Sequence, residues 1–193
     1  MRCCGEVFGG SDSSASRRFF STFRGTRASE GVSVPDSGST VFGRLRRKLQ
    51  ESGVDFVHTR HRPVYTSPEA AEVRGAVLHS GAKAIVLKAG ARFVMVVLPA
   101  DLALDSAAVR RHLGCKRMRF ATKDEVFELT GLTPGSIPPF GSLFDLPTLC
   151  DERLSDNREI NFNAGSHTDS FRLAYQAYNE VESPMRGRFA RSA

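Results

Sequence analysis

Residues 83–98, Lys83-Ala-Ile-Val-Leu-Lys-Ala-Gly90-Ala-Arg-Phe-Val-Met-Val-Val-Leu98, decide the fold class of this chain. Two runs rich in aliphatic residues flank the short turn Ala89-Gly90-Ala91. Branched aliphatic residues favour strands, and a glycine-containing turn of this length joins two strands into an antiparallel hairpin. The stretch therefore predicts a hairpin within a largely antiparallel sheet.

Helices and short strands are predicted on both sides of this hairpin. Apolar residues recur at helical spacing from 42 to 49, and Ser67-Pro68-Glu69 is typical of a helix start. Further helices are expected to begin at 105, at the capping box 122–125, and at 168. The last of these carries Phe171, Ala174, Tyr175 and Tyr178. With short strands at 55–60, 116–120, 149–150 and 158–163, the pattern predicts a mixed α/β fold, a single domain with a largely antiparallel, barrel-like sheet flanked by helices.

The composition divides the chain into an arm, a domain and a tail. Residues 1–40 are rich in Ser, Gly and Arg, which predicts a disordered N-terminal arm. Segment 17–24 mixes Arg, Ser and Phe as organelle transit peptides do. We therefore expect a cytoplasmic protein, or a mitochondrial one if the arm is a transit peptide rather than a plain extension. Residues 41–183 form the predicted domain, and residues 184–193, with three Arg and no acid, form a basic C-terminal tail.

The whole-chain numbers bound the function classes. A length of 193 residues, with 40% hydrophobic and 25% charged residues, suits a globular domain with a sizeable core. No run approaches the ~18 apolar residues that a membrane span needs. The four cysteines and five histidines lack the spacing of a zinc site, so we expect no metal site. A net charge of +6 is compatible with a nucleic-acid partner.

A loop at 131–141, Gly131-Leu-Thr-Pro134-Gly135-Ser136-Ile-Pro-Pro-Phe-Gly, is dense in glycine and proline. Glycine permits positive φ and close approach to the backbone, and proline stiffens its neighbours. A rigid loop that exposes the N–H groups of Gly131, Gly135 and Ser136 is suited to hold an oxyanion or a phosphate. The same residues also suit a plain connecting loop, and the loop alone leaves both interpretations open.

Other polar residues are candidates for a site. Lys83 begins an otherwise apolar strand, where its ammonium either meets an anion or is solvated. Asn163, Gly165 and His167 lie in a polar turn that either binds an anion or only links two elements. Asp151 either anchors a polar network or caps a turn. No Ser or Cys nucleophile is identifiable beside His167, so no catalytic triad is predicted.

From about residue 43 to residue 182, the order of these motifs resembles the YbaK/prolyl-tRNA-synthetase-associated family of aminoacyl-tRNA editing domains. The family's Gly-x-x-Pro-Gly signature matches Gly131-Leu-Thr-Pro134-Gly135. The other matching stretches are 61–71, 81–87, 96–101, 137–141, Asp151 and 160–165. Residues 1–40 and 184–193 lie outside the resemblance.

The resemblance implies a freestanding, trans-acting deacylase that hydrolyses the ester of mischarged tRNA, with Ala- or Cys-tRNA for proline as the expected substrates. It places the catalytic residues at Lys83, Gly131 and Gly135. The expected substrate-binding residues are Pro134, Ser136, Asp151, Asn163, Gly165 and His167. Mischarged tRNA and prolyl-tRNA synthetase are the expected partners. The resemblance implies no protein nucleophile, metal or cofactor, because a ribose hydroxyl of the tRNA or the substrate side chain assists.

Two other functions stay open at this point. A non-catalytic module of the same fold would use the glycine loop to hold tRNA or a nucleotide. A small-molecule esterase would need a nucleophile that the sequence does not identify. The oligomeric state is not indicated by any pattern in the chain.

Overall fold

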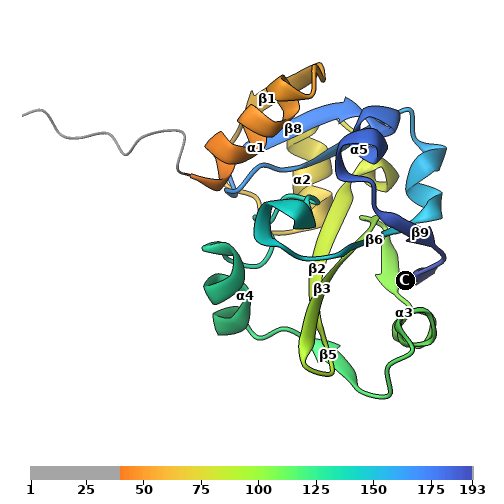
Figure 1. Ribbon diagram of the computed structural model, residues 1–193. Helices are drawn as coiled ribbons and strands as arrows, with labels where there is room; N and C mark the ends of the chain where they lie inside the picture. The colour runs from red at the N-terminus through yellow and green to blue at the C-terminus, as the bar shows by residue number, and fades with distance from the viewer. Residues whose placement is uncertain (1–39, 193) are drawn as a thin grey trace, which may run out of the picture. The chain divides into compact units, whose positions relative to one another are not determined.

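The computed structural model describes residues 40–192 (Figure 1). The predicted N-terminal arm, residues 1–40, lies outside the described residues apart from Thr40. A central sheet of five strands has the order β5-β2-β3-β6-β9. Its members are β5 (Met118–Phe120), β2 (Ala82–Ala89), β3 (Arg92–Pro99), β6 (Thr148–Asp151) and β9 (Met185–Gly187).

The β2–β3 hairpin is confirmed, with an antiparallel register that runs from Ala82 opposite Pro99 to Ala89 opposite Arg92. Strand β5 extends the sheet antiparallel to β2, whereas β6 lies parallel to β3 and β9 parallel to β6. Alternate residues of β3 enter two different hydrophobic clusters, with Met95 on one face and Val96 on the other. The strand is therefore buried on both faces, which explains its nearly continuous apolar sequence.

Two smaller sheets complete the fold in the described part of the chain. Strands β1 (Phe56–Arg60), β8 (Asp169–Ala174) and β7 (Glu159–Asn163) form an antiparallel sheet in the order β1-β8-β7. Strand β4 (Leu102–Leu104) pairs with β10 (Ala190–Ser192). The mixed α/β, largely antiparallel prediction is confirmed, but the strands do not close into a barrel. Strands β6 and β9 extend the central sheet on the side away from β5. Its two edge strands, β5 and β9, therefore do not pair with each other.

Four of the five α-helices in residues 40–192 begin at a residue whose side chain caps the helix, and the helix that begins at Tyr175 has no such cap. The helices are α1 (Val41–Glu51), α2 (Ser67–Arg74), α3 (Ser106–Leu113), α4 (Lys123–Thr130) and α5 (Tyr175–Glu182), with 3₁₀ turns η1 (Leu78–Ser80), η2 (Gly141–Phe144) and η3 (Glu152–Asp156). The predicted capping box of α4 is present, and α2 has a second one. Its cap is Thr66, one residue before the predicted Ser67. Figure 1 shows α3 and α4 on opposite sides of the β2–β3 hairpin, in agreement with their separate hydrophobic clusters.

The predicted helix from Thr168 is wrong in its first half. Residues Asp169–Ala174 form β8, which pairs with both β1 and β7, and α5 begins only at Tyr175. Phe171 is 0% exposed and Leu173 is 2% exposed, whereas Arg172 between them faces solvent. Burial of alternate residues between two partner strands outweighs the local helix-start signal at Thr168.

The basic segment 184–193 is part of the fold over its described residues. Strands β9 and β10 lie within it. Phe189 between them is 2% exposed and belongs to the same hydrophobic cluster as Val96 of β3. No helix of residues 40–192 is long and apolar enough to cross a membrane.

Candidate functional site

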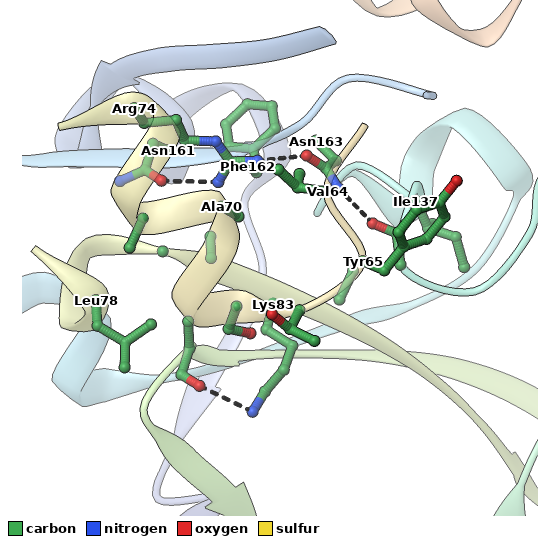
Figure 2. Close-up of a pocket in the computed structure, with 18 of the residues that line it drawn as sticks. Val64, Tyr65, Ala70, Arg74, Leu78, Lys83, Ile137, Asn161, Phe162 and Asn163 are labelled. Atoms are coloured by element: carbon green, nitrogen blue, oxygen red, sulfur yellow. Dashed lines mark hydrogen bonds between the residues drawn. The ribbon is translucent and has the colours of Figure 1, made fainter. Parts of the chain in front are cut away.

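A cavity of about 270 Å³ opens where α2, the start of β2, strand β7 and the glycine loop meet (Figure 2). Both Lys83 and Gly135 line it, although 52 positions separate them in the sequence (135 minus 83). The wall is partly apolar and partly polar. Its polar side chains come from Tyr65, Thr66, Ser67, Arg74, Lys83, Asn161 and Asn163.

Lys83 lines the cavity from the second position of β2, at the open end of the central hairpin. Its Nζ donates to the backbone carbonyls of Leu102, at 2.8 Å, and Ala100, at 3.2 Å. Burial lowers the pKa of the Lys83 ammonium, and the nearby Asp101 carboxylate opposes this shift. Two neutral acceptors orient the ammonium and leave one of its three N–H donors for a ligand.

Gly135 contributes backbone to the lining of the same cavity. Its φ of +92° lies where side chains are rarely found, and a Cβ there would meet His167 Cε1 at 3.1 Å. Asn163 Nδ2 donates to the Gly135 carbonyl at 2.6 Å. Within residues 40–192 the Gly135 N–H has no recorded acceptor, so this amide is available to a ligand oxygen.

The other two predicted amide donors are already used. Gly131 ends α4 and its N–H donates to Phe127 O at 2.7 Å, while the Ser136 N–H donates to Thr133 O at 3.2 Å. Gly131 lies in a separate hollow beside α1, and neither it nor Pro134 lines the cavity. Of the three predicted amide donors, only that of Gly135 is available to a ligand, because those of Gly131 and Ser136 are hydrogen-bonded within their own turns.

The glycine loop is held by hydrogen bonds to Asn163, Gly165 and His167. The Gly165 N–H donates to Ser136 O at 3.0 Å. His167 Nδ1 donates to Val64 O at 2.9 Å, and Nε2 lies at hydrogen-bond distance, 3.2 Å, from Thr133 Oγ1. Of these three, only Asn163 also lines the cavity.

Asp151 lies away from the cavity and holds the C-terminal segment. It is 0% exposed and accepts hydrogen bonds from the N–H groups of Phe189 and Ala190, both at 2.7 Å, and from Arg153. Burial on its own raises the pKa of Asp151, but these hydrogen bonds outweigh it and lower the value. Asp151 therefore stabilises the C-terminal segment and does not contact the cavity.

Arg74 is a polar residue of the cavity that the sequence analysis did not identify. Its guanidinium donates to Ser170 Oγ at 2.8 Å, to Asn161 Oδ1 at 2.9 Å and to Asn163 Oδ1. Burial lowers its pKa to about 10, and no carboxylate in residues 40–192 pairs with it. Arg74 thereby fixes the amide of Asn163 so that its NH₂ group faces the Gly135 carbonyl. A lone arginine in the last turn of a helix carries no sequence signal for this role.

Comparison with known proteins gives a consistent set of matches. A sequence model of aminoacyl-tRNA editing domains matches residues 61–181. The multifunctional Ser/Thr-tRNA deacylase ProXp-y of Escherichia coli K12 is 35% identical over 161 residues, which cover 81% of this chain and 96% of that protein. The prolyl-tRNA editing protein ProX of Acetoanaerobium sticklandii is 28% identical over 140 residues, 69% of this chain and 85% of the relative. A matching segment of 96 residues is 16% of the proline–tRNA ligase of Trichlorobacter lovleyi.

Solved structures share the fold. A hypothetical protein superposes with a TM-score of 0.71 at 20% identity, over 77% of this chain and 99% of that one. A proposed trans-editing enzyme for prolyl-tRNA synthetase superposes with a TM-score of 0.69 at 24% identity, over 80% of this chain and 99% of that one. At these identities the structural likeness supports the fold alone.

Proposed function

This chain belongs to the aminoacyl-tRNA editing domain family, and we propose that it is a deacylase that removes small, wrongly attached amino acids from tRNA. The observation that carries the proposal is that Lys83 and Gly135 line one cavity. A cation and an uncommitted backbone amide that line the same cavity suit an ester whose carbonyl oxygen gains negative charge during hydrolysis.

The reaction adds water across the ester bond. Water oxygen bonds to the aminoacyl carbonyl carbon, and the bond from that carbon to the ribose oxygen breaks. The ribose oxygen takes a proton, so the products are the free amino acid and uncharged tRNA. We assign the Gly135 N–H and the third N–H of Lys83 to the carbonyl oxygen, where each donor is worth most in the transition state. As the resemblance implies, a ribose hydroxyl of the tRNA or the side chain of the substrate assists the reaction.

The cavity supports a preference among small side chains. Its volume of about 270 Å³ must also admit part of the ribose, which favours small amino acids over bulky ones. Thr66, Ser67 and Asn161 in its wall offer polar partners for a substrate hydroxyl. We therefore place Ser and Thr first, in keeping with the name of the Escherichia coli relative, ahead of Ala and Cys on tRNA for proline.

A panel of mischarged tRNAs tests this function. Purified protein is incubated with Ser-, Thr-, Ala- and Cys-charged tRNA for proline, with correctly charged Pro-tRNA as the excluded substrate, and the remaining aminoacyl ester is measured over time. We expect hydrolysis of the small-residue esters and none of Pro-tRNA. Binding of these tRNAs without any hydrolysis would instead establish the non-catalytic module. Association with prolyl-tRNA synthetase is a separate proposal, tested by gel filtration of the two proteins with tRNA.

Lys83 has a matched control on its own strand. Lys83→Ala should lower the hydrolysis rate by about 100- to 1000-fold, the usual effect of losing one donor to the oxyanion. Lys88→Ala should keep the wild-type rate, because Lys88 pairs with Glu125 at 2.9 Å and does not line the cavity. If a folded Lys83→Ala protein hydrolyses at the wild-type rate, Lys83 is not the functional lysine.

A further inference from the structure

The side chain of Tyr65 stands at the rim of the cavity and takes no part in the hydrolysis described above. It lines the cavity yet is 74% exposed, and Figure 2 shows it beside Asn163 and Ile137, at the glycine-loop wall. The other aromatic side chains of residues 40–192 with comparable exposure, Phe120 and Phe127, do not line this cavity. An exposed aromatic ring at the mouth of a site is suited to contact a ligand.

The backbone that carries this ring is held in place by three hydrogen bonds. The Val64 N–H donates to His167 O at 3.0 Å, and His167 Nδ1 donates back to Val64 O at 2.9 Å. The Tyr65 N–H donates to Glu69 Oε2 at 3.0 Å. The Tyr65 and His167 rings lie with centroids 4.8 Å apart and planes at 39°. The ring therefore has a fixed base and one supported face, which reduces the entropy lost when a ligand binds.

The covalent structure of aminoacyl-tRNA indicates which group of the substrate lies near the Tyr65 ring. The aminoacyl ester is attached to the ribose of the terminal nucleotide of tRNA, and the terminal base is attached to the same ribose. When the ester lies between Lys83 and Gly135, that base must lie within one sugar ring of them, at the cavity rim. Proteins bind unpaired RNA bases by stacking them on aromatic side chains.

We propose that Tyr65, backed by His167, is the stacking platform for the unpaired 3′-terminal base of tRNA. This inference rests on the proposed function, because the substrate fixes where the base lies. It adds a binding site for a nucleobase that is distinct from the groups acting on the ester.

A coupling experiment on uncharged RNA tests the platform without requiring hydrolysis. A labelled RNA minihelix with a CCA end and the same minihelix lacking the terminal base are titrated with wild-type protein, Tyr65→Ala and Tyr65→Phe. Tyr65→Ala should weaken binding of the complete minihelix by about tenfold to 100-fold, the range expected from losing one stacked base, and leave the abasic minihelix unaffected. Tyr65→Phe should bind like the wild type, because the ring is retained. Phe127→Ala, a matched exposed aromatic on α4, should bind like the wild type.

The outcomes separate this inference from the deacylase assignment. Equal weakening of both RNAs by Tyr65→Ala, or no weakening of either, overturns the platform, and so does a wild-type protein that does not distinguish the two RNAs. Coupling between Tyr65 and the terminal base, in a protein that hydrolyses no mischarged tRNA, supports the platform and refutes only the deacylase.

Discussion

Replacing Gly135 by Ala should abolish most of the activity while leaving a folded protein. The φ of +92° and a contact of 3.1 Å between the new Cβ and His167 Cε1 both oppose the substitution. Backbone held in such a region costs a residue other than glycine about 1–3 kcal/mol. His167 cannot yield freely, because Val64 and Thr133 hold its two ring nitrogens. The loop must therefore shift by a few tenths of an ångström to reach an ordinary contact.

That shift moves the amide that we assign to the oxyanion. Losing one such donor lowers the rate by about 100- to 1000-fold, so kcat/KM should fall within that range. The assay is deacylation of mischarged tRNA under single-turnover conditions, with circular dichroism to confirm the fold. Because the loss belongs to the transition state, kcat should account for most of it.

Gly131→Ala is the matched control within the same signature. Its φ of +69° also disfavours a side chain, at a cost of about 1–2 kcal/mol, but no atom lies within 4 Å of the added Cβ and the residue is outside the cavity. It should lower thermal stability and keep the wild-type kcat/KM. A Gly135→Ala protein with more than a third of wild-type kcat/KM would refute the role given to this amide. Equal losses in both variants would assign the effect to the loop as a whole.

Three other predictions follow from the hydrogen bonds of the fold. Arg74→Gln should lower kcat/KM by up to about 100-fold through misplacement of Asn163, with Arg74→Lys partly active; wild-type kinetics in Arg74→Gln would contradict it. Asp151→Ala should reduce the free energy of unfolding by about 1–3 kcal/mol in urea titrations, because the buried N–H groups of Phe189 and Ala190 lose their acceptor, while the protein that stays folded keeps its activity. The hydrogen bond that His79 Nδ1 donates to the Asp101 carboxylate raises the pKa of His79, so this pair stabilises the fold fully below about pH 6.5 and progressively less as pH rises through the raised pKa. Melting temperatures from pH 5 to 9 should show that decline in the wild type and not in Asp101→Asn.

Local sequence signals predicted most elements of the fold correctly. The central hairpin, the caps of α3 and α4 and the helical spacing of α1 depend on neighbours within a few residues, so the chain specifies them without its tertiary contacts. The same logic failed at Asp169–Ala174, where pairing with β1 and β7 decides the structure. It also missed that Phe189 belongs to the core and that the segments around it form β9 and β10, because their partner strands lie near residues 103 and 150.

The sequence by itself determined the family, through the order of its motifs, and it drew attention to Lys83 and to the glycine loop. Only the tertiary structure decided which of the three loop amides is free, because hydrogen bonds to Phe127 O and Thr133 O occupy those of Gly131 and Ser136. The tertiary structure also shows that Asp151 forms an ion pair with Arg153 outside the expected site. It places Arg74 and Tyr65 in the lining of the cavity. The reason is physical: a side chain's type is written in the chain, but its partners come from segments that meet only when the sheets and helices pack.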